Sequence, residues 1–260
     1  KRDKYFKTFD ILKSCSTKNK YQTPIDIQTN TAKYDNNLKK IEYKNWDQDI
    51  DSKYLQLKNL GHNGRLQILP DYKNKPFVTF RNQIYELIEV HFHWGLTDKN
   101  GSNHAINGKF YASEIHLVGK NIKYPTLDIA LEQNDGVLGI TGFFDLDHTH
   151  NKVMAPIMKQ WHQIQKVESM VPFNSSFNFA KLLPENPKSY YYYVGSTAYP
   201  KCGPTQWVIF KQTTKPGLSH YELSTFRTID DNPFNGKTPK VLQNRRHLQP
   251  LNGRSIWSSD

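Results

Sequence analysis

Short apolar runs, separated by Gly, Pro and Asn, recur along most of the chain. These runs are rich in Val, Ile, Phe and Tyr, which is typical of the strands of an all-β protein. We predict strands over residues 66–69, 77–80, 87–94, 113–118, 137–144, 190–194 and 207–210. A helical period is clear only over residues 154–167, and it is weaker over residues 127–131 and 218–227. The pattern therefore predicts a mainly β fold with a few short helices.

The chain contains no Pro/Gly/Ser-rich linker and no internal repeat. Its 260 residues are near the size at which one hydrophobic core stops growing, so length alone allows one domain or two. Because no linker is present, we expect a single domain over residues 1–260 with one central sheet. The longest apolar run, residues 137–144, is interrupted by Gly139 and Gly142 and is shorter than the ~18–20 residues of a membrane span. We therefore expect no transmembrane segment.

Composition excludes some classes of protein. Aromatic residues make up 13% of the chain, and this core-forming material argues against disorder. Lys and Arg number 35 against 24 Asp and Glu, a formal charge of +11, but the basic residues are dispersed along the chain. Proteins that recognise nucleic-acid sequences typically use arginine side chains clustered on one basic surface. Because the basic residues here are dispersed, we expect no nucleic-acid partner. We interpret the charge as a solvated surface that favours solubility or attracts an acidic protein or surface.

The predicted strand over residues 87–94 carries candidate chemistry. Side chains alternate between the two faces of a strand, so Glu89, His91 and His93 share one face with Leu87. The other face carries apolar side chains that would anchor the strand in the core: Ile88, Val90, Phe92 and Trp94. Two imidazoles at positions i and i+2 on one rigid face can bind the same metal ion. Taken alone, the pair is also compatible with ordinary core or surface histidines.

The predicted strand over residues 113–118 supplies a third imidazole. His116 shares a face with Glu114 and Val118, while the residues between them are apolar. Three neutral imidazoles with an open fourth position form the arrangement of catalytic zinc, which lowers the pKa of a bound water to ~7. Glu89 and Glu114 are placed to hold the second ring nitrogens of the histidines. The two strands together therefore favour a metal site over ordinary histidines.

The motifs around these histidines resemble those of the α-class carbonic anhydrases. Residues 89–95 resemble Q-F-H-F-H-W-G and residues 113–118 resemble A-E-L-H-L-V. Further matches are residues 22–27 to Q-S-P-I-x-I, 60–62 to N-G-H, 101–104 to G-S-E-H, 182–184 to L-L-P, and 195–196, followed by Trp207, to the G-S-L-T-T-P-P to W segment. The resemblance covers residues 20–255, and the two histidine motifs are highly specific.

The resemblance implies a fold, a reaction and roles for residues. The fold would be a twisted, mostly antiparallel sheet of about ten strands with short peripheral helices. His91, His93 and His116 would bind Zn²⁺, and the reaction would be the reversible hydration of carbon dioxide to bicarbonate. His62 falls where many active members keep a histidine that carries protons, a role that suits an imidazole. The alternative is an exposed loop histidine, because residues 61–64 are turn-like.

The sequence departs from the family at the residues that orient the reacting groups. Asn103 stands where G-S-E-H has its Glu, and an ungapped alignment of residues 195–202 puts Ala198 at the position of the orienting Thr and Tyr199 at the next. Loss of one such polar group costs ~10²–10³ in rate. We therefore predict reduced activity. The alternative is a catalytically weak or inactive zinc-binding domain that serves a structural, assembly or binding role.

The apolar wall that receives carbon dioxide in the family is altered as well. Val118 and Trp207 are kept. Thr197 replaces a Leu and Gly139 replaces a Val, and Thr205 takes the place of a second Val. A small apolar gas gains less from such a pocket, which again predicts weaker activity.

The residues alone leave Cys15 and Cys202 as two free thiols or as one long-range disulfide. Such a disulfide would contribute ~4–5 kcal/mol in the chain-entropy model if the compartment is oxidising. The resemblance to secreted members places the two cysteines to pair, which implies a secreted, extracellular or organelle-lumen protein. The chain begins at a polar segment without a visible leader, and a leader can have been removed. Asn100 and Asn174 begin triplets of the form that accepts N-glycosylation.

Overall fold

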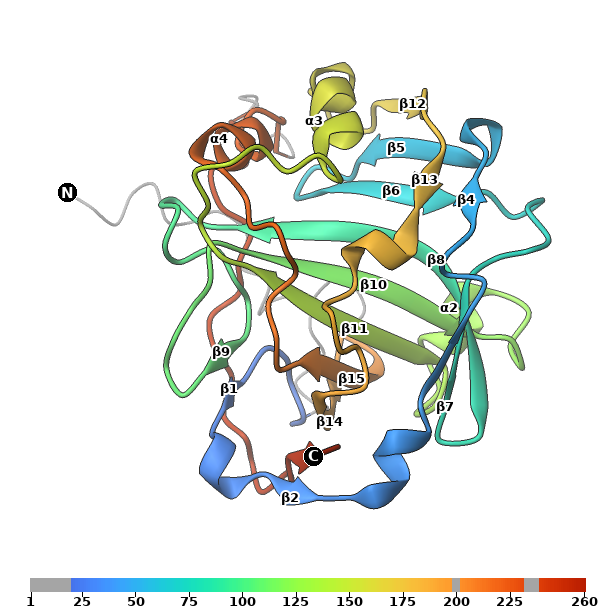
Figure 1. The fold of residues 1–260 in the computed structure, drawn as a ribbon, viewed down its shortest axis with the longest axis vertical. Helices are drawn as coiled ribbons and strands as arrows, with labels where there is room; N and C mark the ends of the chain where they lie inside the picture. Colours follow the sequence, from blue (N-terminus) through green and yellow to red (C-terminus); the bar gives the residue numbers. More distant parts are fainter. Residues whose placement is uncertain (1–19, 198–201, 232–238) are drawn as a thin grey trace.

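A large twisted sheet forms the centre of the protein (Figure 1), whose computed structural model describes residues 20–197, 202–231 and 239–260. The sheet has 12 strands. Its main path runs β12 (Met170–Pro172), β5 (Leu55–Asn59), β6 (Gly64–Ile68), β8 (Gln83–Trp94), β10 (Ser113–Asn121), β11 (Val137–Phe144), β15 (Pro204–Phe210), β14 (Tyr190–Ser196), β16 (Trp257–Ser258) and β2 (Lys33–Tyr34). Off this path, β7 (Phe77–Phe80) pairs with β8, and β3 (Glu42–Lys44) pairs with β7.

Most neighbouring strands of this sheet are antiparallel, and the parallel pairs are β11 with β15 and β16 with β2. The expected mainly β, mostly antiparallel fold is therefore confirmed. Two small sheets accompany it: β1 (Asp26–Ile27) with β9 (Ala105–Ile106), and β4 (Asp49–Ile50) with β13 (Phe177–Asn178). The division of the whole chain into domains stays a prediction, although strands from near both ends of the described chain join one sheet.

The helices are short and peripheral. The α-helices are α2 (Leu127–Ala130), α3 (Ala155–Trp161) and α4 (His220–Phe226), and the 3₁₀ helices are η1 (Thr29–Thr31), η2 (Asn36–Lys40), η3 (Ser52–Tyr54), η4 (His162–Ile164) and η5 (Phe179–Leu182). Each helical period found in the sequence overlaps an α-helix, but the helices are shorter than predicted. Among the described residues, none of these helices has the length and apolar character needed to cross a bilayer.

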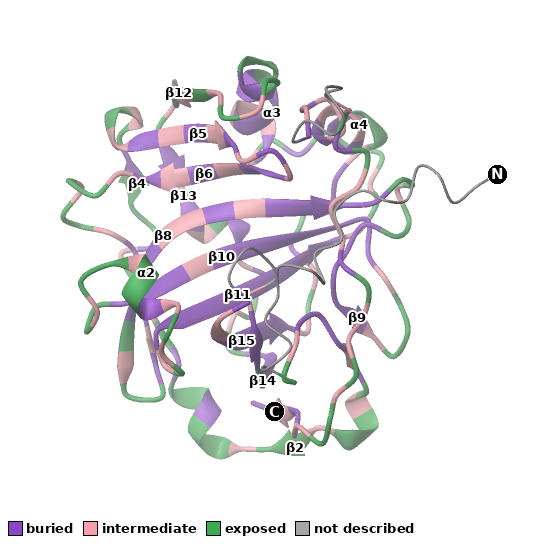
Figure 2. Cartoon of the chain, turned by 180° about the vertical axis from the view of Figure 1, so that it is seen from behind, coloured by how far each residue is buried: buried purple, intermediate pink, exposed green. Residues whose placement is uncertain are grey.

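The seven predicted strands all overlap observed strands, and β7 and β11 have the predicted bounds. Two central strands, β10 and β11, are buried along most of their length (Figure 2). Burial on both faces explains why the sequence of β11 is a nearly continuous apolar run, whereas the buried polar residues of β10 include Glu114 and His116. The strands that sequence analysis missed are mostly two or three residues long, too short for an alternating pattern to stand out.

One face of β8 is anchored by aromatic packing against the helices. The Phe226 ring of α4 stacks on Phe92 and Trp94, with ring centroids 5.1 and 5.3 Å apart. The Trp161 ring of α3 meets Phe226 edge-on at 5.2 Å. This packing buries the apolar face of β8 and directs the polar side chains between these residues toward the opposite side of the sheet.

The predicted alternation of β8 fails at its N-terminal half. The register against β10 shifts between Val118 and Gly119, so that Val118 pairs with Glu89 and Gly119 pairs with Leu87. This β-bulge places one extra residue, Ile88, in β8 and reverses the alternation. Leu87 is therefore buried in the core with 1% exposure, and the expectation that it shares a face with the histidines is wrong. Ile88 is only half-buried, which corrects its expected place in the core.

Candidate metal centre

Three imidazoles converge on neighbouring strands at the middle of the sheet. The register places His91 of β8 opposite His116 of β10, with His93 two residues further along β8. The Nδ1 atom of His116 lies 3.2 Å from Nε2 of His91 and 3.2 Å from Nε2 of His93. His93 and His116 are buried, and the His91 side chain is 16% exposed. The three predicted metal-binding residues thus lie together.

The other ring nitrogen of each histidine meets an oxygen that can only accept a hydrogen bond. His91 Nδ1 lies 3.1 Å from Glu89 Oε1, and His116 Nε2 lies 2.5 Å from Glu114 Oε1. His93 Nδ1 donates to the backbone carbonyl of Asn244 at 3.2 Å. Since each outer nitrogen must donate its hydrogen, the inner nitrogen of each neutral ring carries a lone pair.

Three lone pairs facing one another are the arrangement that a cation stabilises. Nitrogen ligands at about 2.0–2.1 Å from a tetrahedral zinc ion lie ~3.3 Å apart, close to the 3.2 Å measured here. Burial lowers the pKa of His116 to about 4 and the pKa of His93 well below its usual value. Both rings are therefore neutral near pH 7, as metal binding requires. The geometry, tautomers and charge state all fit a zinc ion.

Glu114 links the triad to a buried network that the sequence only hinted at through the G-S-E-H match. Its Oε2 accepts from the backbone N–H of His104 at 2.7 Å, and its Oε1 accepts from Nδ1 of His104 at 2.7 Å. Nε2 of His104 then accepts from the Tyr193 hydroxyl at 2.7 Å, and Thr23 lies 2.9 Å beyond. Burial alone would raise the pKa of Glu114, but His104 and His116 outweigh it and hold the pKa below its ordinary range.

A second group of possible metal ligands, His104, Glu114 and His116, shares these atoms. The carboxylate oxygens of Glu114 are already engaged by three N–H donors, so this group serves the hydrogen-bond network rather than a separate ion.

Glu89 is held from both sides. Its Oε1 meets His91, and its Oε2 forms an ion pair with the guanidinium of Arg65 on β6. Burial favours a higher pKa for Glu89, but His91 and Arg65 prevail and lower its pKa to about 2. Sequence analysis identified Glu89 but not Arg65, because only the pairing of β6 with β8 brings the two together.

Asn244 was also missed, because it lies far along the chain from β8. Its side-chain oxygen accepts from the backbone N–H of Trp94 at 2.8 Å, and its side-chain N–H₂ donates to the backbone carbonyl of Phe92 at 2.9 Å. These two bonds fix Asn244 at the end of β8, where its own carbonyl accepts from His93. Because any residue can supply a backbone carbonyl, the sequence does not show which one accepts from His93.

His62 lies in the turn before β6 and is half-buried. Its Nδ1 lies 3.1 Å from the Leu60 carbonyl. Burial, followed by the nearby charge of His91, lowers the pKa of His62 to about 4. An imidazole with this pKa is a weak proton acceptor near pH 7.

The residues expected to line the apolar wall form a row across three strands. Val118 of β10 pairs with Gly139 of β11, which pairs with Trp207 of β15. The Trp207 ring lies 4.7 Å from the His116 ring. A Cβ atom at Gly139 would sit 2.6 Å from Trp207 Cε3, so the indole fills the space of a side chain at this position. Thr197 is half-buried, and its buried hydroxyl has no hydrogen-bond partner among the described residues.

Asn103 is buried, and its Oδ1 accepts from the backbone N–H of Arg246 at 2.8 Å. Ala198 and Tyr199 lie outside the described residues, as does Cys15. Cys202 is 4% exposed. The roles expected for Ala198, Tyr199, Cys15 and Cys202 stay predictions.

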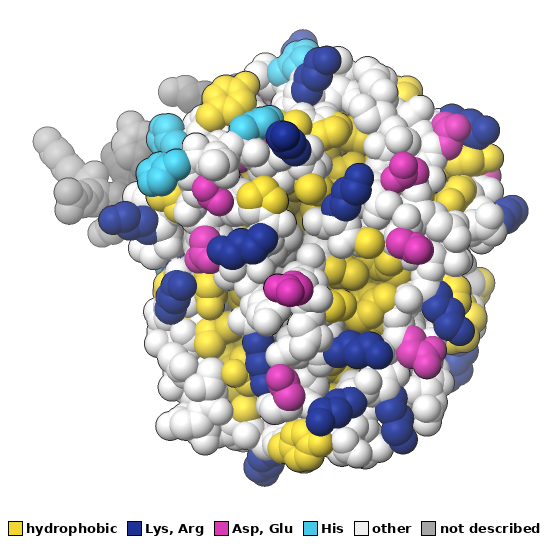
Figure 3. Space-filling model, in the orientation of Figure 1, with side chains coloured by type: hydrophobic (Ala, Val, Ile, Leu, Met, Phe, Trp, Pro, Cys, Tyr) yellow, Lys and Arg dark blue, Asp and Glu magenta, His cyan; other side chains and the backbone are white. Residues whose placement is uncertain are grey.

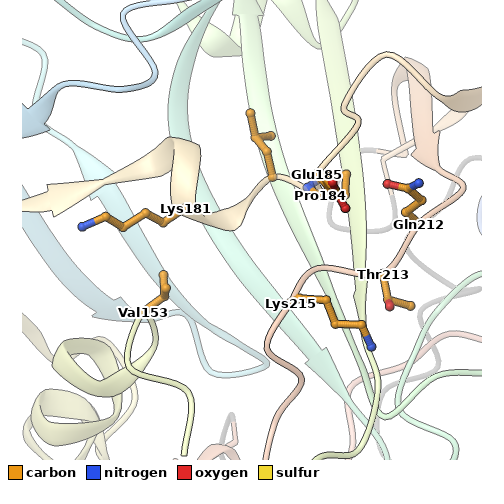
Figure 4. Close-up of a pocket in the computed structure, with 8 residues that line it drawn as sticks. Val153, Lys181, Pro184, Glu185, Gln212, Thr213 and Lys215 are labelled. Atoms are coloured by element: carbon orange, nitrogen blue, oxygen red, sulfur yellow. The ribbon is translucent and has the colours of Figure 1, made fainter.

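A surface hollow of about 660 Å³ lies apart from the histidines (Figure 4). Its lining comes from η5 and the segment after it, from the segment after β15 and from the segment before α3, and consists of Val153, Lys181, Leu183, Pro184, Glu185, Gln212, Thr213 and Lys215. On the face of the molecule drawn in Figure 3, Lys and Arg side chains are spread out rather than gathered in one patch. That view agrees with the dispersed charge of the sequence.

The fold and the site define a mainly β protein with a largely buried group of three histidines that could hold a metal ion. The model of the eukaryotic-type carbonic anhydrase family matches residues 7–260, so the chain belongs to this family. The family is zinc-dependent, and the His91, His93 and His116 group is available for a metal. The resemblance that the motifs indicated is therefore confirmed.

Two relatives show the extent of the similarity. Carbonic anhydrase 12 of Homo sapiens is 27% identical over 247 residues, which cover 92% of this chain and 66% of that protein. Carbonic anhydrase 15 of Mus musculus is 29% identical over 245 residues, which cover 92% of this chain and 75% of that protein. The chain thus spans about two thirds of the length of the human relative.

Proposed function

We propose that this protein is a zinc-dependent carbonic anhydrase that hydrates carbon dioxide reversibly to bicarbonate with reduced turnover. The observation that carries the proposal is the convergence of three imidazole lone pairs at 3.2 Å, each fixed by an acceptor on the far side of its ring. His91, His93 and His116 would hold the ion through these nitrogens. When bound, zinc supplies the Lewis acidity that ionises water near neutral pH.

The surrounding residues would orient the ligands and receive the substrate. Glu89, Glu114 and the Asn244 carbonyl hold the outer ring nitrogens, which keeps the inner nitrogens unprotonated. Val118, Gly139, Thr197 and Trp207, with Tyr199 by resemblance, would form the wall that faces carbon dioxide. Because the Trp207 indole fills the space that a side chain at residue 139 would occupy, the indole forms this part of the wall, with its ring 4.7 Å from that of His116.

Reduced turnover follows from two departures. Asn103 is neutral, and its Oδ1 already accepts from the backbone N–H of Arg246, so it does not supply the charged acceptor that the Glu of G-S-E-H offers to the orienting hydroxyl. Ala198 has no hydroxyl to donate. Loss of one such interaction costs ~10²–10³ in rate. His62, proposed as the proton carrier, is a weak acceptor near pH 7 because burial lowers its pKa to about 4.

A second candidate function is a zinc-binding domain with little or no turnover that serves assembly, structure or binding. Asn103 and Ala198 favour it, because the orienting pair is lost while the three histidines are kept. Zinc would then brace β8 against β10. The net charge of +11 suits an acidic protein or surface as its partner.

Hydration kinetics on protein of measured zinc content separates the two functions. The comparison includes His116→Ala and, as a matched control, His148→Ala, a change at an exposed histidine outside the triad. Hydration faster than buffer that is lost in His116→Ala and kept in His148→Ala supports the enzyme. Full zinc content with no rate above buffer supports the second function. A wild-type protein that retains no zinc contradicts both.

We also propose that Cys15 pairs with Cys202 and that the protein works in a secreted, extracellular or lumenal compartment. The burial of Cys202 and the exposed positions of Asn100 and Asn174 support this proposal, since glycan acceptors must be accessible. Mass measurement of the non-reduced protein after thiol alkylation tests it. A mass lower by two hydrogens and no alkylation is expected, whereas two alkylated thiols would exclude the pairing.

A further inference from the structure

The ion pair between Arg65 and Glu89 lies next to His91 of the candidate metal centre. β6 and β8 are neighbouring strands (Figure 1), and their register places Arg65 opposite His91 and Gln67 opposite Glu89. The guanidinium of Arg65 contacts Oε2 of Glu89, while Oε1 of the same carboxylate contacts Nδ1 of His91. One carboxylate therefore bridges a cation on β6 and a metal-facing imidazole on β8.

This bridge depends on a charged residue where the family motif quoted above has a neutral one. Residue 89 is Glu in this chain, whereas the resembling motif Q-F-H-F-H-W-G begins with Gln. The Glu89 side chain is only 12% exposed. A carboxylate with so little access to water needs a cationic or hydrogen-bonding partner on each oxygen. Arg65 supplies the partner for the oxygen that His91 does not use.

The Arg65 side chain is itself confined. It is 23% exposed, and its Nε atom is buried with no hydrogen-bond partner among the described residues. The contact with Glu89 is the one ion pair that it forms within the described part of the chain. The guanidinium is thus positioned by the carboxylate rather than by a set of other acceptors.

We propose that Arg65 is a positioning residue for the metal centre and acts through Glu89. By fixing Oε2, it keeps Oε1 on Nδ1 of His91, and this contact holds Nε2 of His91 toward the other two histidines. Without the guanidinium, the Glu89 side chain can turn away from His91 to reach water, and the His91 ring loses its fixed orientation. The inference rests on the proposed zinc site, not on the rate of any reaction.

Metal release from the full chain tests this role with Zn²⁺ and Co²⁺ as probes. Arg65→Met removes the charge and keeps side-chain length, and Arg65→Lys keeps the charge. Outer partners of metal-binding histidines typically change metal affinity by about 10–100-fold, so we expect zinc to leave Arg65→Met about tenfold faster than wild type. The visible spectrum of the Co²⁺ form should shift in Arg65→Met, and Arg65→Lys should restore most of both properties.

The dependence on Glu89 is tested by a double-mutant cycle. In a Glu89→Gln background, Arg65→Met should add less than about twofold to the release rate, because its target is already altered. Arg81→Met is the matched control, since Arg81 is an exposed arginine at the turn between β7 and β8. The Arg81→Met protein should release zinc at the wild-type rate. If Arg65→Met does not fold, Arg65→Gln carries the same expectation.

Three results would overturn the proposal: release from Arg65→Met that is unchanged, release that is slower than wild type, or an undiminished tenfold effect in the Glu89→Gln background. Slower release would mean that the arginine charge merely repels the metal. A wild-type chain that binds neither Zn²⁺ nor Co²⁺ would instead contradict the proposed function. The two failures are therefore distinguishable.

Discussion

The change Glu114→Gln tests the buried network behind the triad. The carboxylate accepts three hydrogen bonds, from the backbone N–H and Nδ1–H of His104 and from Nε2–H of His116. An amide has one oxygen and one N–H₂, so it cannot accept all three. If His116 is to keep its lone pair toward the other histidines, the amide oxygen must replace Oε1. The amide N–H₂ then meets the backbone N–H of His104.

The cost of this conflict can be estimated from the contact that is lost. The backbone N–H of His104 donates to the charged carboxylate at 2.7 Å, and both residues are fully buried. A hydrogen bond to a charged group contributes about 1.5–3 kcal/mol, and a buried donor left without a partner costs about 1–3 kcal/mol. A backbone N–H has no second tautomer that could relieve the conflict. We expect the free energy of unfolding to fall by about 3 kcal/mol.

The same network has a pH signature. Burial would raise the pKa of Glu114, but His104 and His116 outweigh it and the folded pKa lies below the ordinary value. A lowered folded pKa contributes stability that is fully present above the unfolded pKa of ~4.3 and is lost as the pH falls below it. The difference in free energy of unfolding between wild type and Glu114→Gln should therefore be largest near neutral pH and become smaller in acid.

Urea unfolding of the metal-free protein, near pH 7 and in acid, measures both effects. Glu132→Gln, at an exposed glutamate, is the matched control and should stay within about 0.5 kcal/mol of wild type. A Glu114→Gln protein with the wild-type urea midpoint at neutral pH would refute the reasoning, because the carboxylate could not then be holding three donors.

Three further changes give distinct outcomes. Gly139→Val places atoms where Trp207 packs, so thermal unfolding should show a loss of about 1–3 kcal/mol, and an unchanged melting temperature would mean that the indole moves freely. Burial tends to raise the pKa of Asp98, but His220 and Arg227 lower it below its ordinary value. Asp98→Asn should therefore reduce the free energy of unfolding above pH ~3.9, and the stability of the two proteins should converge at lower pH. A series of urea midpoints at different pH values measures this difference. Asn103→Glu combined with Ala198→Thr restores the orienting pair and should raise the hydration rate by about 10²-fold per zinc. An unchanged rate would mean that the loss of this pair is not the cause of the reduced turnover.

Much of the site could be read from residue spacing. His91 and His93 are two apart on a strand, and His116 follows Glu114 by two on another, so period-two alternation alone places His91 beside Glu89 and His116 beside Glu114. The histidine motifs indicated the family, which the family model confirms. Local pattern suffices here because the pairing of the two strands is regular at the histidines, over residues 89–94 and 113–118.

The errors and omissions have physical causes. Leu87 was assigned to the wrong face because a bulge depends on how β8 pairs with β10, not on the sequence of β8 alone. Arg65 and Asn244 were missed because each reaches the site across a large sequence separation, the first through strand pairing and the second through a backbone carbonyl. The shortest strands were missed because two residues carry no period.

The sequence by itself determined the class of fold, the three imidazoles and two of their acceptors, since alternation along a strand is a local property. Tertiary structure decided what surrounds them. It paired Arg65 with Glu89, joined Glu114 to His104 and packed Trp207 against Gly139. Those contacts depend on which strands become neighbours and in what register. That choice comes from packing the whole core, which no single segment encodes.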